Sequence, residues 1–85
     1  TLPVLTEQRR KDLVKLVHAR LEEARVAARN IRRDVLKDMR EFEHEKLVSE
    51  DELKRGEDDL QKLTEKIIQQ IESIGDKKEK EIMEV

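Results

Sequence analysis

The sequence predicts an all-α protein in which two long amphipathic helices pair as an antiparallel hairpin. Strong helix formers dominate the 85 residues, 47% of which are charged, and Gly and Pro are rare. Apolar residues recur at helical spacing along most of the chain, which argues against disorder despite the high charge. The chain has a single aromatic residue, Phe42, and therefore lacks the side chains that usually fill the core of a sheet protein.

The first helix is expected over about residues 7–45. Pro3 disfavours helix at Leu2, whereas Thr6 is a good N-cap and Glu7 lies at the positive end of the helix dipole. No helix breaker follows, so this helix should be roughly 55–60 Å long. Its apolar residues at helical spacing are Leu13, Val17, Leu21, Ala24, Ile31, Val35, Met39 and Phe42.

The second helix is expected over about residues 50–83. Residues 49–52 (SEDE) form a capping box, and Val48 can pack against Leu53 as a hydrophobic staple. Gly56 and Gly75 should weaken this helix without breaking it. The connection around residues 45–48 is so short that the helices must run antiparallel. The apolar residues of the second helix at heptad and alternate positions are Leu53, Leu60, Leu63, Ile67, Ile71 and Ile74.

The apolar stripe of the first helix is wider than a two-helix seam needs. At about 100° per residue it covers roughly 80–100° of the helix surface. We therefore expect a third helix to pack there, so that the hairpin would be the larger part of a three-helix bundle. The chain begins at Thr1 without an initiator Met. The third helix is thus expected from a missing segment of the same protein or from another molecule.

The formal net charge of −2 hides an uneven distribution. Residues 1–46 hold 12 Lys or Arg against 9 Asp or Glu, whereas residues 47–85 hold 7 against 12. Several of the basic residues in the first half lie in one sector of the first helix, which is about 80° wide and away from the apolar stripe. Arginine there suits phosphate recognition, although a solvated face with salt bridges to Glu22 and Glu43 is the alternative interpretation. The residues of this sector are Lys11, His18, Arg25, Arg29, Arg32 and Arg40.

Other chemistry is not expected. His18 and His44 have no second ligand at metal-binding spacing, so we expect neither a metal nor another cofactor. The adjacent Asp58 and Asp59 lie on an exposed helix without a concave pocket, which is not an enzyme site. Cysteine is absent, and no apolar run approaches the roughly 20 residues that span a bilayer. These features predict a cytoplasmic protein with no membrane partner.

Five segments in collinear order resemble the C-terminal part of bacterial ribosome recycling factors. One is residues 23–34 (EARVAARNIRRD), within which the block over residues 24–34 is highly specific. The other four are residues 5–13 (LTEQRRKDL), 49–51 (SED), 61–64 (QKLT) and 78–84 (KEKEIME).

The resemblance implies a non-enzymatic translation factor. In that family a long three-helix bundle lies across the A and P sites of the large ribosomal subunit and contacts 23S ribosomal RNA. With elongation factor G and GTP, the factor splits the ribosome into subunits after termination. The arginines of the family are matched here by Arg25, Arg29, Arg32 and Arg33, of which Arg32 carries the most weight. Together with Lys11 and His18 they are the predicted RNA-binding residues.

The resemblance also implies what this chain lacks. The N-terminal helix of the bundle and an α/β insertion domain have no counterpart in it. Residues 1–5 would be the end of the hinge or return strand from that insertion, and residues 6–85 would belong to the helical bundle. The absent N-terminal helix would then be the third helix that the wide apolar stripe requires.

Two hypotheses follow from these patterns. The first is an RNA-binding translation factor whose cationic sector holds ribosomal RNA. The second is a structural or adaptor coiled-coil hairpin whose apolar stripe binds a protein helix. Binding to RNA should weaken steeply with salt, which separates the first hypothesis from the second.

Overall fold

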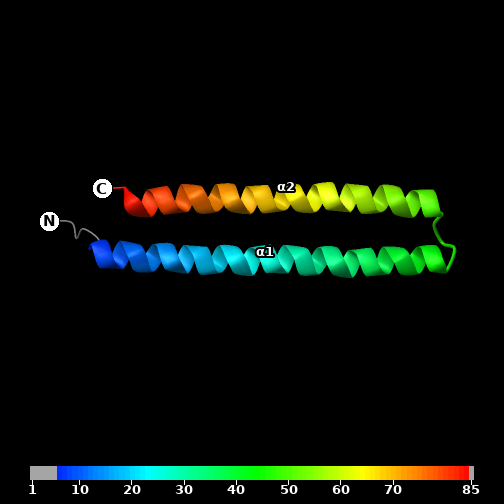
Figure 1. Ribbon diagram of the computed structural model, residues 1–85, viewed down its shortest axis with the longest axis horizontal. Helices are drawn as coiled ribbons and strands as arrows, with labels where there is room; N and C mark the ends of the chain where they lie inside the picture. The colour runs from blue at the N-terminus through cyan, green and yellow to red at the C-terminus, as the bar shows by residue number, and fades with distance from the viewer. Residues whose placement is uncertain (1–5, 85) are drawn as a thin grey trace.

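The computed structural model describes residues 6–84 and contains two long helices, α1 (Glu7–His44) and α2 (Glu50–Met83), with no strand in that range. The helices lie side by side and run in opposite directions (Figure 1), in a rod of 67 × 15 × 15 Å. The predicted all-α antiparallel hairpin is confirmed. The hinge or return strand expected at residues 1–5 lies outside the described residues.

Both helices begin at the predicted caps. The Thr6 hydroxyl accepts the backbone N–H of Arg9 at 3.0 Å. At Ser49 the capping box is complete, because the Ser49 hydroxyl accepts the N–H of Glu52 and the Glu52 carboxylate accepts the N–H of Ser49, each at 3.1 Å. The bond from the Ser49 backbone is the main reason that the pKa of Glu52 lies below its usual value.

The turn between the helices contains a left-handed residue that was not predicted from the sequence. Lys46 adopts a positive φ of 62°, a left-handed conformation that most often belongs to Gly or Asn. The N–H of Lys46 bonds to the carbonyl of Glu43, and the N–H of Leu47 bonds to the carbonyl of Phe42, both at 2.9 Å. This pair of bonds is the Schellman motif, which satisfies the last carbonyls of α1 and turns the chain towards α2.

The two helices make a seam but do not enclose a core. No apolar side chain in residues 6–84 is fully buried. Thr64 of the seam is buried, and its hydroxyl donates to the carbonyl of Leu60 at 2.8 Å. The half-buried apolar residues of the seam include Val14, Val17, Leu21, Leu36 and Met39 of α1 and Leu53, Leu60, Ile68, Ile71 and Ile82 of α2.

Both glycines of α2 lie against side chains of α1. A Cβ placed on Gly75 would come within 2.3 Å of Leu21 Cδ1 and 2.9 Å of its Cδ2, and one placed on Gly56 would come within 2.3 Å of Met39 Cε. These glycines do not interrupt α2. They give room to side chains of α1, so they are packing positions as well as weak points in helix propensity.

Arg10 joins the first turns of α1 to the end of α2. Its side chain is buried, with the residue 8% exposed, and Nη1 donates to the carbonyls of Met83 at 3.0 Å and Glu84 at 3.1 Å. Carbonyls at the end of a helix have no partner within that helix, and they form its negative pole. Arg10 therefore supplies both hydrogen bonds and charge to the C-terminus of α2.

The glycine contacts predict a difference between two alanine substitutions. Gly75→Ala should destabilise the hairpin by about 1–2 kcal/mol, because the branched end of Leu21 must be displaced. Gly56→Ala should be neutral or stabilising by up to about 1 kcal/mol, because Met39 Cε is the tip of a flexible chain and Ala favours helix. Thermal or urea unfolding of the two variants measures this. Equal losses in both would show that the contact with Leu21 has no special cost.

The contacts of Arg10 predict a local loss of structure. Arg10→Ala should destabilise the hairpin by about 1–3 kcal/mol and increase amide exchange in the last turn of α2, because two carbonyls lose a charged donor. Arg9→Ala is the matched control, since Arg9 is its exposed neighbour. If the two variants exchanged and melted alike, Arg10 would not be holding the end of α2.

Candidate functional site

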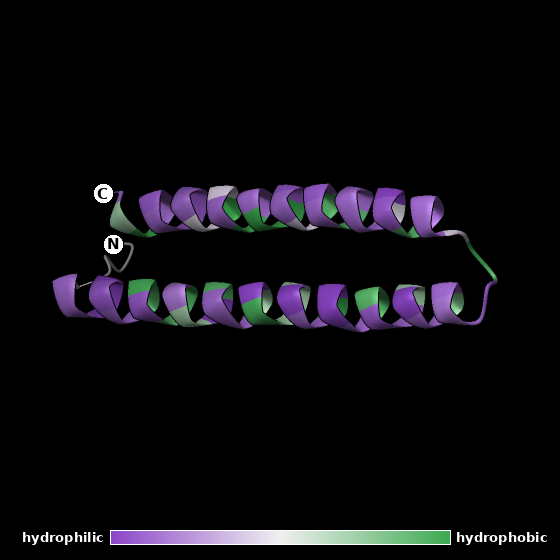
Figure 2. Ribbon diagram, turned by 45° about the vertical axis from the view of Figure 1, so that its right-hand side comes forward, coloured by the Kyte–Doolittle hydropathy of each residue, from purple (hydrophilic) through white to green (hydrophobic). Residues whose placement is uncertain are grey.

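The hairpin presents its polar and apolar residues on different sides. Figure 2 shows hydrophobic positions on the sides of α1 and α2 that turn towards each other and hydrophilic positions over most of the outer surface. Some apolar side chains remain exposed beside the seam. The predicted RNA-binding residues all belong to α1, so their position relative to α2 decides which of them can meet a ligand.

A row of polar contacts, here called the polar ladder, crosses from α1 to α2 along one flank. Its α1 members are spaced by seven or eight residues, and its α2 members by four to eleven, so the contacts repeat along the rod. His18 Nε2 lies 3.2 Å from Glu79, Arg32 donates to Gln61 at 3.2 Å, and Arg40 lies 3.6 Å from Glu57. The fourth contact is between Arg25 and Glu72.

Arg25 is the most constrained of the predicted residues. Its Nε donates to Glu22 at 3.1 Å and its Nη1 donates to Glu72, and its side chain is only 21% exposed. The bonds to Glu22 and then Glu72 raise the pKa of Arg25 above its ordinary value. With a carboxylate on each helix, the charge of Arg25 is directed into the hairpin rather than towards solvent.

Arg32 lies one heptad further along the same flank but has a different partner. Its guanidinium donates to the side-chain oxygen of Gln61, which is neutral. No carboxylate of residues 6–84 forms an ion pair with Arg32. The positive charge of Arg32 is therefore not neutralised by direct contact, although its side chain is half-buried and held.

Arg29, Arg33 and Lys11 are exposed on α1. Arg33 Nη2 donates to Asn30 at 2.9 Å within the helix. Neither Arg29 nor Lys11 forms a side-chain hydrogen bond or ion pair with another residue of the described range. Arg29, Arg32 and Arg33 are thus three neighbouring cations that have no carboxylate bound to them in this part of the chain.

The sequence predicted one cationic sector, and the structure divides it. Of its members, His18, Arg25, Arg32 and Arg40 reach partners on α2, whereas Lys11 and Arg29 do not. Arg33, which the resemblance added to the predicted RNA-binding residues, bonds within α1. The partners on α2 were not identified from the sequence. One signal could have found them: Glu72 and Glu79 are spaced by seven residues, as are Arg25 and His18.

An apolar groove runs between the helices. It has a volume of about 350 Å³ and takes in exposed residues of both helices, including Ile31, which is 63% exposed, and Leu63, which is 54% exposed. A second hollow of about 270 Å³ surrounds Ile74, which is 64% exposed. The residues that line the larger groove are Ala24, Ala27, Ala28, Ile31, Arg32, Leu60, Leu63, Thr64, Ile67 and Ile71.

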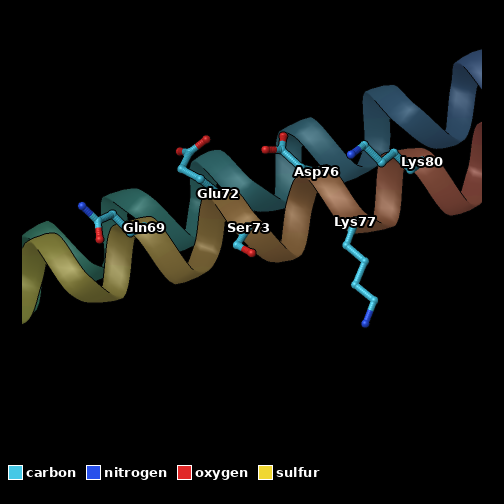
Figure 3. Close-up of a pocket in the computed structure, with 6 residues that line it drawn as sticks. All are labelled: Gln69, Glu72, Ser73, Asp76, Lys77 and Lys80. Atoms are coloured by element: carbon cyan, nitrogen blue, oxygen red, sulfur yellow. The ribbon is translucent and has the colours of Figure 1, made fainter.

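A further hollow on α2 does not suggest catalysis. It is bordered by Gln69, Glu72, Ser73, Asp76, Lys77 and Lys80, which all belong to α2. Figure 3 shows Glu72 and Asp76 on one side of α2 and Lys77 pointing to the opposite side, so the six side chains do not converge on a common point.

Two further observations concern metal binding and membrane insertion. Within residues 6–84, no three His, Cys, Asp or Glu side chains gather into a group that could hold a metal ion. Over the same range, neither helix has a stretch apolar enough to cross a lipid bilayer.

Comparison with known proteins agrees with this architecture. A family model described as Ribosome recycling factor matches residues 1–83. The ribosome-recycling factor of Syntrophomonas wolfei is 58% identical over 84 residues, which are 99% of this chain and 45% of that protein. The ribosome-recycling factor of Roseiflexus sp. strain RS-1 is 52% identical over the same shares of the two chains.

A third relative, the ribosome-recycling factor of Symbiobacterium thermophilum, is 53% identical over 85 residues, which are 100% of this chain and 46% of that protein. The chain therefore spans a little less than half the length of the relatives that it matches. The match nevertheless runs through both helices, the turn between them and the arginine-rich part of α1. By this match, the chain belongs to the ribosome recycling factor family.

Proposed function

We propose that this chain acts as a non-enzymatic part of a cytoplasmic translation factor that disassembles post-termination ribosomes. It binds the large ribosomal subunit through 23S ribosomal RNA in the region of the A and P sites, and elongation factor G is its partner. Family membership supports the process. The observation that supports RNA as the contact is the group Arg29, Arg32 and Arg33, where three cations lie together without a bound carboxylate in the described range.

The three arginines suit the phosphates of a folded RNA. Positions i, i+3 and i+4 lie on the same side of a helix, so guanidinium groups at 29, 32 and 33 can reach neighbouring phosphate oxygens. Each guanidinium offers planar, bidentate donors that an ammonium group lacks. Such contacts release counterions and give binding that depends on salt. The hairpin thus contributes binding and position, while GTP hydrolysis by elongation factor G supplies the energy for subunit separation.

The apolar groove supports a second part of the proposal. We propose that an N-terminal helix of the same protein covers the groove and completes a three-helix bundle. No apolar side chain of residues 6–84 is fully buried, and Ile31, Leu63 and Ile74 are each more than half exposed. A third helix laid across them would bury these side chains at once.

The groove also keeps the second candidate function open. An adaptor hairpin would use Ile31, Leu63 and Ile74 to bind a helix of another protein, and its arginines would then be ordinary surface. The two candidates differ in what the arginines do. RNA binding whose salt dependence is reduced when Arg32 is removed favours the translation factor. Absence of such RNA binding favours the adaptor.

The groove predicts stabilisation by a helix. A peptide with the N-terminal helix of one of the relatives named above should raise the thermal midpoint of the hairpin, because each Leu or Ile side chain that it buries contributes about 1.5–3 kcal/mol when burial is complete. Ile31→Asp should abolish this increase, whereas Val26→Asp, a control on the outer face of α1, should retain it. An unchanged midpoint at saturating peptide would rule out the three-helix arrangement.

Binding to isolated large subunits at several salt concentrations tests the RNA contact. Arg32→Ala should weaken binding and reduce the salt slope by about one unit, because one phosphate contact is lost. Arg32→Lys should recover only part of the affinity, since it keeps the charge but loses the fork. The stability of the fold should change by about 1 kcal/mol or less, because one exposed hydrogen bond is removed.

Glu41→Ala is the control for this series, because it changes charge on a different side of α1. Its affinity should equal that of the wild type or exceed it slightly. If all four proteins bound equally at every salt concentration, Arg32 would be ordinary surface and the adaptor function would be preferred.

A further inference from the structure

Two arginines at equivalent positions of the polar ladder have partners of different charge. Arg25 and Arg32 are seven residues apart on α1, and Glu65 and Glu72 are seven residues apart on α2. Arg25 binds Glu72 directly. Repetition of the same pattern would bring Arg32 to Glu65, but Arg32 binds Gln61 instead and forms no ion pair with a carboxylate of residues 6–84.

Gln61 links Arg32 to Glu65 through both ends of its amide. Arg32 Nη1 donates to Gln61 Oε1 at 3.2 Å, and Gln61 Nε2 donates to Glu65 Oε1 at 3.0 Å. A guanidinium can only donate and an ionised carboxylate can only accept, so only one orientation of the amide satisfies both neighbours. Glu65 thus fixes the direction of the Gln61 carbonyl, and that carbonyl fixes the guanidinium of Arg32.

We propose that Gln61 is a positioning residue, which orients the Arg32 guanidinium towards an RNA phosphate while leaving its charge uncompensated. This inference rests on the proposed function, because it specifies how one residue of the RNA-binding surface is prepared. Gln61 would not itself contact the RNA phosphate. It acts through Arg32, whose side chain is half-buried, borders the apolar groove and donates to Gln61.

A neutral acceptor suits this role better than a carboxylate or no partner. A carboxylate at position 61 would pair with the guanidinium and compete with phosphate for the same donors. Without a partner, the long arginine side chain would sample many rotamers and lose that freedom on binding. Arg25 illustrates the first case, because it is bound by Glu22 and Glu72 and its side chain is 21% exposed.

The test exchanges amide and carboxylate at position 61. In the full-length protein, with any segment that flanks residues 1–85, binding to isolated large ribosomal subunits is measured over a range of salt concentrations. Gln61→Glu should lower the affinity about tenfold and reduce the salt slope by about one unit, as Arg32→Ala does, while leaving the thermal midpoint unchanged or higher. Gln61→Ala should lower the affinity only a few-fold, because the charge of Arg32 remains.

A matched control and a double variant separate positioning from general repulsion. Gln69→Glu adds the same charge to the exposed surface of α2, two turns from Gln61, and should change affinity much less than Gln61→Glu. In the Arg32→Ala background, Gln61→Glu should have almost no further effect, because the residue on which it acts is gone.

Four results would overturn the inference. Equal losses for Gln61→Glu and Gln69→Glu would mean that only overall charge matters. A full effect of Gln61→Glu in the Arg32→Ala background would mean that Gln61 does not act through Arg32. If Arg32→Ala bound like the wild type, or if the wild type did not bind large subunits, the proposed RNA contact would fail as well. The first two results, by contrast, would reject the positioning role of Gln61 and leave the RNA contact of Arg32 standing.

Discussion

The close approach of α1 and α2 along a single seam determines most other properties of the molecule. Gly75 lies against Leu21, and Gly56 lies against Met39, at separations that leave no room for a Cβ in the observed arrangement. These contacts favour one register between two long helices that could otherwise slide by a heptad. The register in turn decides which carboxylate of α2 meets which cation of α1, as Arg25 and Glu72 show. The electrostatic character of the surface therefore depends on packing in the seam.

The same seam is too narrow to bury all the apolar side chains of the two helices. Two cylinders in contact can bury only one strip of each other, and the strips here leave Ile31, Leu63 and Ile74 more than half exposed. Ile31 and Leu63 lie in the apolar groove, and Ile74 lies in the second hollow. Arg32 belongs to the polar ladder and also borders the apolar groove, whereas Arg29 and Arg33 are exposed and do not line it. The helix proposed to cover the groove would therefore lie beside Arg32 and leave Arg29 and Arg33 exposed.

Local features were predictable from the sequence, and contacts between the helices were not. The caps at Thr6 and Ser49 follow from a few adjacent residues, so the pattern alone identified them. The partners of Arg25 and Arg32 depend on the register between the two helices, which no local pattern specifies. Arg25 and Glu72 are 47 residues apart in the sequence, and Arg32 and Gln61 are 29 residues apart. The left-handed conformation of Lys46 was not predictable either, because this position of a Schellman motif is usually Gly and a Lys does not indicate it.

The acidic half of the chain is compatible with RNA binding, although the net charge is −2. A ligand at the surface responds to the nearby field, because exposed charges are screened within about 8–10 Å at ordinary ionic strength. Two carboxylates of α2 are bound by arginines of α1, Glu72 by Arg25 and Glu57 by Arg40. Where Arg32 meets α2, the acceptor is the neutral Gln61, and Arg29 and Arg33 stand beside it. These two ion pairs offset charge where they form, and Arg29, Arg32 and Arg33 remain as a group of cations without a bound carboxylate in the described range. A cationic region defined in this way is local, so the RNA contact proposed above does not require a protein with a positive net charge.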